Sequence, residues 1–456
     1  MNMMVSSMKG LNEINNYINL NKGNVNSKYR LKYHMMPPIG WMNDPNGLVY
    51  FKDKYHVFYQ FNPYNSLPGT MLWGHFVTDD LISYKDLNAA IIPTIEHGNI
   101  FSGGAIAIDD ELVALYTLHY EHDGVKTEDI HLAKSKDGVS FEYCGCVFDN
   151  EKLPKNISRI DFRDPCPIKK GDYFYVFVGG RDDELNEGVI IVLRGKTLEN
   201  LDYFFTIGPF YELGDMGECP SYHMVDGKDV LLVSGCRVAQ KNNDFKNENS
   251  SSFIVGNIDF ENGRFDVDFI KEIDKGDTFY APQFINSLDE PIMIGWLEMW
   301  GKPYPTHELN HGWSGALSIP RKLVVKDNDI YQEPIDLSNY EKELGNNFSE
   351  CIDLSLTLSA GGSVLISGDN GEINISLDEY LTLNTINAKN LNGCIRRTNN
   401  SFKECELRIL LDVCSIEFFV DVGLETISSR IYLDGKYHIS YNEFVKNVSV
   451  KEIGAE

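Results

Sequence analysis

Three acidic residues stand in short stretches that contain glycine or proline: Asp44 in WMNDPNG, Asp164 in DFRDPCP and Glu218 in GECPSY. Asp before Pro and Asn-Gly is typical of a type I turn, so Asp44 taken alone is interpreted as a turn former. If the fold brings the three carboxylates together, like charges raise the pKa of at least one. One ionised carboxylate and one carboxylic acid held protonated near neutral pH is the pair that a glycosidase uses.

A repeated unit indicates how these acids could meet. Polar turns that run into an aromatic residue recur along the first two thirds of the chain, roughly 60 residues apart, a spacing typical of four-stranded propeller blades. The closing aromatics are Tyr84, Phe141, Tyr203 and Phe265. Short apolar runs such as YFYVFVGG and DVLLVSG lie between them. The repeat predicts five blades, one of them formed from both ends of the region, with equivalent ends of the inner strands at one mouth of the channel.

The pattern changes after Pro320-Arg321. Runs such as CIDLSLTLSA, GEINISL and ELRILLDVCSIEFFV alternate apolar and polar residues, as the strands of an antiparallel β-sandwich do. We therefore expect an all-β chain with a five-bladed β-propeller catalytic domain at 30–335 and a C-terminal β-sandwich at 336–456. Residues 1–29 form a separate segment, in which Leu11, Ile14 and Ile18 have the spacing of a short amphipathic helix.

Composition restricts the partners and the compartment. The formal net charge of −26 argues against nucleic acid or an anionic membrane as the main partner and suits a neutral small molecule. No apolar run is long enough to span a membrane, and the first 29 residues lack the apolar core of a signal peptide. Nine cysteines without CxxC spacing are expected to be reduced. We expect a cytoplasmic protein, monomeric or homodimeric.

The three acidic motifs, WMNDPNG, RDP and ECP in that order, resemble the signature motifs of glycoside hydrolase family 32. Further similar stretches are QFNP, WGH, FSGG, DKGDTFYAPQ and GWSGALSIPRKL, and LRILLDVCSIEFFV resembles a motif of the family's sandwich domain. The resemblance covers the chain from residue 28 onward. It implies a five-bladed propeller followed by a β-sandwich, in agreement with the repeat. It also implies retaining hydrolysis of terminal non-reducing β-D-fructofuranosyl units from sucrose, sucrose 6-phosphate or short fructo-oligosaccharides.

Matched position by position, the resemblance assigns roles to these acids. Asp44 would be the nucleophile, Glu218 the acid/base and Asp164 the transition-state stabiliser, with Arg163 holding Asp164 and Glu218 in place. Other matched positions would bind the fructosyl ring: Asn43, Gln60 and Ser102. Aromatic residues would wall the pocket: Trp41, Trp73, Phe101, Tyr280 and Trp313. No metal or organic cofactor is implied, because carboxylates supply both nucleophile and proton.

The sequence raises two other functions. HELNH, residues 307–311, matches the zinc-protease pattern, whose chemistry needs both histidines on one helical face. Pro303, Pro305 and Gly312 leave no room for such a helix. A non-catalytic sugar-binding propeller would lack one of the carboxylates, and all three are present. No residue identifies itself as a phosphate ligand; the candidates by charge alone are Arg181, Arg237, Lys241 and Lys302.

Overall fold

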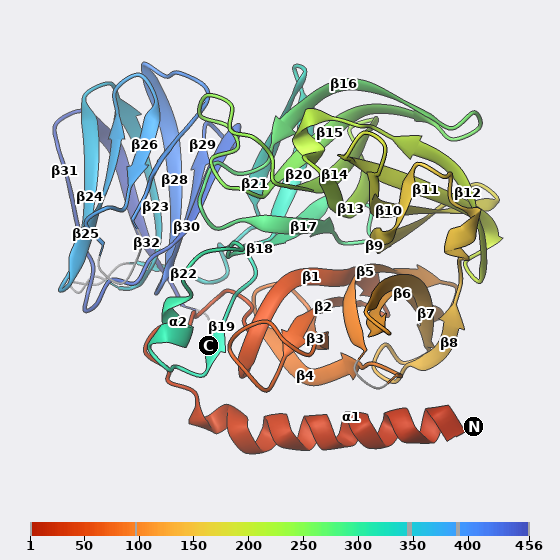
Figure 1. The fold of residues 1–456 in the computed structure, drawn as a ribbon. Helices are drawn as coiled ribbons and strands as arrows, with labels where there is room; N and C mark the ends of the chain where they lie inside the picture. Colours follow the sequence, from red (N-terminus) through yellow and green to blue (C-terminus); the bar gives the residue numbers. More distant parts are fainter. Residues whose placement is uncertain (1, 96–97, 344–348, 389–392, 455–456) are drawn as a thin grey trace.

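The computed structural model describes residues 2–95, 98–343, 349–388 and 393–454. Strands in this part of the chain form seven sheets (Figure 1). Five sheets are built from residues 40–334, and two further sheets, drawn in blue, pack together beside them. The all-β expectation is thereby confirmed for the bulk of the chain. Among the described residues, no helix combines the length and apolar character needed to cross a membrane.

Each of the first five sheets uses four consecutive long strands, apart from short insertions. The first sheet contains β1 (Gly40–Phe51), β2 (Lys54–Asn62), β3 (Leu72–Thr78), β4 (Tyr84–Ile91) and the short β19 (Trp313–Ser314). The second contains β5 (Asn99–Ile108), β6 (Glu111–His122), β7 (Val125–Ser135) and β8 (Glu142–Cys146). The third contains β9 (Ile157–Lys170), β10 (Tyr173–Asp182), β11 (Glu187–Thr197) and β12 (Asn200–Ile207).

The fourth sheet contains β13 (Met216–Val225), β14 (Lys228–Cys236), β15 (Ser250–Asp259) and β16 (Arg264–Glu272). The fifth contains β17 (Tyr280–Phe284), β18 (Ile292–Trp296), β20 (Arg321–Lys326) and β21 (Asp329–Pro334). The expected sharing of one sheet between both ends of the region is limited to β19, which pairs in parallel with β1 over two residues.

The first strands of these five sheets form a closed ring. β1 contacts β5, β5 contacts β9, β9 contacts β13, β13 contacts β17, and β17 contacts β1. The four recurring polar turns connect the third strand of a sheet to the fourth in the first four sheets. The repeat seen in the sequence is therefore the sheet itself, and the five ring strands are its equivalent elements.

The predicted turn at Asp44 is wrong. β1 continues through NDPNG, and its register with β2 shifts between Met42 and Pro45 and again between Asn46 and Val49. Such shifts are β-bulges, which bend a strand without ending it. The chain reverses further along, where Lys52 and Asp53, both with positive φ, form the two-residue hairpin connection from β1 to β2.

The remaining two sheets enclose a separate apolar core. One contains β22 (Glu341–Glu343), β32 (Val445–Ile453), β23 (Cys351–Ser359), β28 (Glu404–Asp412), β29 (Ser415–Val420) and β30 (Glu425–Arg430). The other contains β27 (Ile395–Arg397), β26 (Leu381–Asn384), β25 (Gly371–Leu377), β24 (Gly362–Gly368) and β31 (His438–Tyr441). The run 406–420 forms parts of two strands joined at Val413–Cys414. Alternate residues such as Leu354, Ile375 and Phe418 fill the space between the sheets.

The other face of the six-stranded sheet meets the five-sheet part through buried charges. Arg321 donates to Asp274 at 2.9 Å and to Glu417 at 2.6 Å. His34 lies between Asp412 and Glu417, with 2.8 Å to each carboxylate. All five side chains are fully buried, so each charge depends on its buried partner or partners, and the contacts to Asp412 and Glu417 cross to the six-stranded sheet.

The predicted N-terminal helix is confirmed, and it extends on both sides of the residues that predicted it, Leu11, Ile14 and Ile18. α1 (Asn2–Asn21) lies along β4 at the edge of the first sheet (Figure 1). Ile18 is fully buried there, and the Asn15 side chain bonds both the N–H and the carbonyl of Ala89. The other helical segments are α2 (Pro305–Glu308) and the 3₁₀ turns η1 (Lys22–Asn24), η2 (Asn150–Lys152) and η3 (Tyr211–Leu213).

Candidate active site

The ring strands bring Asp44, Asp164 and Glu218 to one cavity of about 290 Å³. Its wall also includes residues from β2, from β7, from the loop before β3 and from the segment after β18. The other lining residues are Asn43, Gln60, Pro68, Gly69, Met71, Phe101, Ser102, Lys126, Glu128, Arg163 and Trp300.

A bulge at the same level of each ring strand presents these side chains. The pairing registers of β5, β9, β13 and β17 shift at Ser102, Asp164, Cys219 and Ala281, as that of β1 does near Asp44. Asp164, Cys219 and Ala281 have positive φ, a conformation that costs non-glycine residues about 1–3 kcal/mol. Bulges re-aim side chains next to active sites, and here they do so in all five sheets.

Asp44 is buried and fixed through one carboxylate oxygen. Ser102 Oγ donates to Asp44 Oδ2 at 2.7 Å, and the Cys219 thiol lies 3.6 Å from the same atom. Burial raises the pKa of Asp44 to about 6; the charge of Glu218 adds to this shift, and the bond from Ser102 opposes it.

Glu218 is held at both oxygens. Arg163 donates to Oε1 from Nη2 at 2.6 Å and from Nε at 3.2 Å, while the Tyr280 hydroxyl donates to Oε2 at 2.7 Å. Burial alone would raise the pKa of Glu218, but the charge and hydrogen bonds of Arg163, together with Tyr280, lower it below its ordinary value. Burial raises the pKa of Asp164 to about 7, with Arg163 opposing the shift and Glu218 adding to it.

This order of pKa values differs from the expectation that the acid/base carries the raised pKa. The reason is geometric: the guanidinium of Arg163 contacts Glu218 directly, whereas Asp44 bonds a neutral hydroxyl. Asp164 accepts its bond from the Cys219 N–H at 3.0 Å. When Asp44 and Glu218 together carry one proton in the free protein, that proton therefore resides mainly on Asp44.

A buried carboxylate on β7 holds the other side of Arg163. Glu128 Oε2 accepts from Arg163 Nη1 at 3.1 Å, and Glu128 Oε1 contacts Lys126 at 3.0 Å and His119 at 3.2 Å. Despite burial, these partners lower the pKa of Glu128 to about 2. A fixed negative charge thus orients Arg163 toward Glu218.

Of the residues expected to bind substrate, Asn43, Gln60, Phe101, Ser102 and Arg163 line the cavity. These five come from β1, β2, β5 and β9, so the ring strands and one second strand supply them. Tyr280 does not line it but contacts Glu218 through its hydroxyl.

The expected tryptophan wall is largely not found. Trp41, Trp73 and Trp313 are fully buried and are not among the cavity residues. Trp41 Nε1 donates to Asn43 Oδ1 at 2.7 Å, and Trp73 Nε1 donates to the Phe101 carbonyl at 3.0 Å. Both indoles therefore support residues of the cavity from behind.

Trp313 belongs to a different environment. Its ring lies under the guanidinium of Arg30, 4.9 Å from the ring centroid, in a core cluster that also contains Leu410 and Phe419 of the six-stranded sheet. β19 contributes only two residues, Trp313 and Ser314, which pair with Gly40 and Trp41 at the start of β1. Trp300, which the sequence reasoning missed, lines the cavity instead.

The missed residues Met71, Lys126 and Glu128 come from a loop and a third strand, so no ring-strand motif marks them. A signal for the bulges was present in the sequence. NDP, RDP, ECP and YAP each place a polar residue two positions before a proline within a ring strand. Proline lacks a ladder N–H and is tolerated at bulges, so this recurrence marks the bulge positions.

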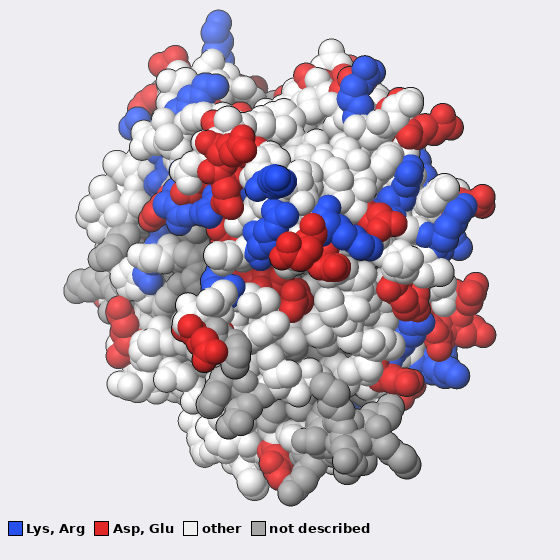
Figure 2. Space-filling model, turned by 45° about the vertical axis from the view of Figure 1, so that its right-hand side comes forward, with Lys and Arg blue, Asp and Glu red and all other residues white. Residues whose placement is uncertain are grey.

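The candidate phosphate ligands lie outside the cavity. Arg181 pairs with Asp161 at 3.0 Å, and Arg237 is bonded to Asp215. Lys302 pairs with Asp277 at 3.1 Å. The fourth candidate, Lys241, lies near the ring of Tyr211. On the face shown in Figure 2, Lys and Arg side chains lie beside Asp and Glu side chains rather than in a continuous basic patch.

The HELNH stretch does not form a zinc-protease helix, because α2 has four residues. His307 Nδ1 lies 2.8 Å from Ser66 Oγ, whereas the His311 ring stacks on Tyr29 with centroids 5.4 Å apart. Among the described residues, no group of three or more His, Cys, Asp or Glu side chains is placed to hold a metal ion.

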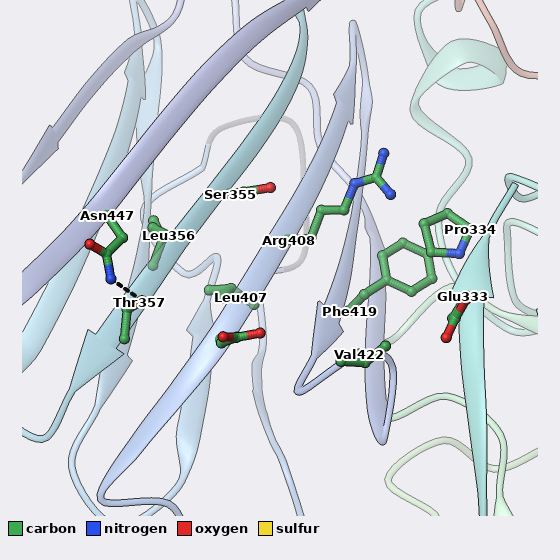
Figure 3. Close-up of a pocket in the computed structure, with 11 residues that line it drawn as sticks. Glu333, Pro334, Ser355, Leu356, Thr357, Leu407, Arg408, Phe419, Val422 and Asn447 are labelled. Atoms are coloured by element: carbon green, nitrogen blue, oxygen red, sulfur yellow. Dashed lines mark hydrogen bonds between the residues drawn. The ribbon is translucent and has the colours of Figure 1, made fainter. Parts of the chain in front are cut away.

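A larger cavity of about 440 Å³ lies between β21 and the face of the six-stranded sheet that meets the five-sheet part (Figure 3). Phe419 and Pro334 form its apolar side, and Arg408 there is paired with Asp353 at 2.6 Å. None of the three clustered carboxylates lines it, so the smaller cavity is the candidate active site.

Comparison with known proteins identifies the family. The model of the glycosyl hydrolases family 32 N-terminal domain matches residues 34–334, and that of the family 32 C-terminal domain matches residues 338–454. A sucrose-6-phosphate hydrolase of Escherichia coli is 29% identical over 441 residues, covering 88% of each chain. One from Bacillus subtilis is 28% identical over 441 residues, covering 89% of each.

Among solved structures, the family 32 β-fructofuranosidase BmSUC1 of Bombyx mori superposes with a TM-score of 0.86 at 30% identity, covering 98% of each chain. A mutant of that enzyme, solved in complex with sucrose, also gives a TM-score of 0.86 at 30% identity, covering 97% of this chain and 98% of the other. The two family models together cover nearly all of the sequence from residue 34 onward, including the three clustered carboxylates. The chain therefore belongs to glycoside hydrolase family 32.

Proposed function

We propose that this chain is a retaining β-fructofuranosidase that releases terminal non-reducing β-D-fructofuranosyl units from sucrose, sucrose 6-phosphate or short fructo-oligosaccharides. The observation that carries the proposal is the convergence of three buried carboxylates on one small cavity, with Arg163 and Tyr280 holding Glu218. Family membership and the names of the similar proteins, sucrose-6-phosphate hydrolase and β-fructofuranosidase, support the substrate class.

In the proposed first step, Asp44 attacks the anomeric carbon and Glu218 protonates the glycosidic oxygen as the bond to the leaving group breaks. Ser102 fixes Asp44 Oδ2, so the nucleophile is oriented before the substrate arrives. The product is a fructosyl ester of Asp44. Glu218, now ionised, removes a proton from water as that water attacks the ester, which releases fructose and restores both carboxyl groups.

The protonation of the pair sets the pH dependence of this chemistry. The reactive form has Asp44 ionised and Glu218 protonated, whereas the pKa of Asp44 is raised and that of Glu218 is lowered in the free protein. The reactive form is therefore the minor form of the singly protonated pair. The kcat/KM profile is bell-shaped, with its acid limb set by Glu218 and its alkaline limb by Asp44.

Asp164 would bond hydroxyls of the fructosyl ring and stabilise the transition state, with Asn43, Gln60 and Ser102 as further ring ligands. The cavity positions of these residues support the assignment. Phe101 and Trp300 offer aromatic faces to the CH groups of the sugar. The mechanism needs no metal or organic cofactor, because carboxylates perform both the attack and the proton transfers.

For the architecture, we infer that the five sheets are the blades of a five-bladed β-propeller spanning 30–335, that 336–456 is a β-sandwich domain and that 1–29 is a separate N-terminal segment. The closed ring of first strands supports the propeller. We also infer a cytoplasmic enzyme that is a monomer or a homodimer.

The direct test is hydrolysis of sucrose, sucrose 6-phosphate and 1-kestose by the purified chain, with kcat/KM measured side by side. The proposal expects fructose from at least one of them, and NMR during the first turnovers should show β-fructofuranose before mutarotation. A preference above tenfold, about 1.4 kcal/mol, would identify the physiological class. No hydrolysis of any fructoside, or initial release of the α anomer, would refute the proposal.

A further inference from the structure

A cavity of about 340 Å³ near the active site is lined by residues that the proposed mechanism does not use. It contains Tyr64, Asn65 and Ser66 from the loop after β2, and His307 and Asn310 from the HELNH stretch. The HELNH sequence matches a zinc-protease pattern, but in the structure its residues His307 and Asn310 form part of the wall of an open pocket.

The pocket lies at the same end of the ring as the carboxylates. Gly40, at the start of β1, lines it, and Asn43, three residues further along the strand, lines the candidate active site. Three residues of extended strand span about 10 Å. The loop after β2 also serves both cavities, since Tyr64–Ser66 line this pocket and Pro68–Gly69 line the active site.

The lining favours a neutral, hydroxyl-rich ligand. Among the described residues, no Lys, Arg, Asp or Glu lines the pocket, although the chain carries a net charge of −26. The amides of Asn65 and Asn310 offer donors and acceptors to hydroxyl groups. Tyr64 lines the pocket and is 50% exposed, and its ring packs 4.9 Å from that of Tyr17 on α1, so the part of this aromatic side chain that Tyr17 leaves open is available to a ligand. CH groups of a sugar pack on aromatic faces.

The wall is preformed by hydrogen bonds that tie its two segments together. Ser66 Oγ and His307 Nδ1 are 2.8 Å apart, which joins the loop after β2 to α2. The Asn62 side chain accepts from the Tyr64 N–H at 3.1 Å and donates to the Leu67 carbonyl at 2.9 Å. A pocket held in this way loses little conformational entropy when a ligand binds.

We propose that this pocket is an accessory subsite for a neutral sugar unit on the leaving-group side of a longer fructoside whose terminal fructosyl unit occupies the active site. The assignment rests on the proposed function, because it takes the substrate's end to lie beside Asp44. It makes the chain an enzyme that gains from oligosaccharide substrates longer than a disaccharide. Tyr64 supplies the stacking surface, and Asn65 and Asn310 bond the hydroxyl groups.

The test compares kcat/KM for sucrose and for nystose, a tetrasaccharide of sucrose extended by two fructosyl units, in the wild type and Tyr64→Ala. We expect the nystose value to fall by about tenfold, the scale of one lost binding contact, and the sucrose value to stay within about twofold. Tyr64→Phe keeps the ring and should retain both values. Tyr441→Ala, which removes a comparably exposed tyrosine from β31, is the matched control and should change neither.

Three results would overturn the subsite. The first is a kcat/KM for nystose that is equal in the wild type and Tyr64→Ala, and the second is a fall in kcat/KM that is equal for nystose and sucrose. The third is a wild type that hydrolyses sucrose but not nystose. If Tyr64→Ala does not fold, Tyr64→Leu keeps an apolar contact with Tyr17 and is judged by the same ratios. Failure of the proposed function is a different result: no fructoside is hydrolysed. In that case the subsite is tested by saturation-transfer NMR with nystose. The signal transferred from the protein to nystose should be weaker in Tyr64→Leu than in the wild type, and an equal signal in the two proteins would overturn the subsite.

Discussion

Stability above neutral pH should depend on one histidine, His34, which lies between two carboxylates of the six-stranded sheet. Its ring nitrogens are each 2.8 Å from a carboxylate oxygen, Nδ1 from Asp412 and Nε2 from Glu417, and all three groups are fully buried. His34 precedes β1, the strand that carries Asp44, by six residues. The contact therefore joins the catalytic part of the chain to the C-terminal sheets.

The size of the effect follows from the pKa of His34. Burial lowers this pKa, but the hydrogen bonds and charges of Asp412 and Glu417 outweigh burial and raise it from 6.5 to about 9. Because the folded pKa is raised, the stabilisation is fully present below about pH 6.5 and is lost as pH rises through about 9. The shift corresponds to about 3 kcal/mol at 1.36 kcal/mol per unit.

The assay is the melting temperature across pH 6 to 9.5 for the wild type and His34→Gln. An unfolding entropy of about 2.1 cal/mol/K per residue gives about 1 kcal/mol/K for this chain unfolding as one unit. The melting temperature of the wild type should therefore fall between pH 6 and 9.5 by about 3 °C more than that of His34→Gln. His34→Gln should melt lower at pH 6, because two buried carboxylates lose their counter-charge. Parallel curves for the two proteins would refute this role of His34.

Three further predictions concern the active site. Glu218→Gln should lose most activity on sucrose but should still form the fructosyl intermediate from a fructoside whose leaving group needs no protonation. Added azide should then restore turnover and give the β-fructosyl azide. Formation of the α-fructosyl azide would contradict the retaining order of steps. Tyr280→Phe removes a charge-assisted bond to Glu218 of about 1.5–3 kcal/mol, so the pKa of Glu218 should rise by about 1–2 units. The acid limb of the kcat/KM profile should move to higher pH by the same amount. An acid limb at the wild-type pH would show that Tyr280 does not lower the pKa of Glu218. Chelators should leave sucrose hydrolysis intact, and His311→Ala should remain active; activity lost to a chelator and restored by zinc would reinstate the metal interpretation of HELNH.

The grouping of the three acids was predictable because it follows from a repeat. Turn-and-aromatic units recur at the third-to-fourth strand connection, and one short motif per ring strand is enough to place Asp44, Asp164 and Glu218 on equivalent elements. The bulge at Asp44 was mistaken for a turn because Asp, Pro, Asn and Gly serve both structures. Which of the two forms depends on β2, whose pairing continues past the motif.

Properties that depend on side-chain direction or on distant partners were not predictable. A motif places Trp313 near the ring strands but does not say that its ring turns away toward Arg30. Glu128 lies on the third strand of a sheet, outside every acidic motif. The pKa order depends on which carboxylate the guanidinium of Arg163 contacts. His34 finds Glu417 at a separation of 383 residues, which no local pattern contains.

The most direct test of the proposed mechanism is to identify the residue that becomes fructosylated. Glu218→Gln, treated with an activated β-fructofuranosyl donor and quenched in acid, should accumulate one fructosyl unit per chain, because the second step lacks its base. Peptide mass spectrometry should place that unit on Asp44, and the double variant that adds Asp44→Asn should remain unlabelled while staying folded, since Asn lacks the nucleophilic oxygen but fills the same space. Label on another residue, or full sucrose hydrolysis by Asp44→Asn in an otherwise unchanged chain, would contradict the assignment of Asp44 as the nucleophile.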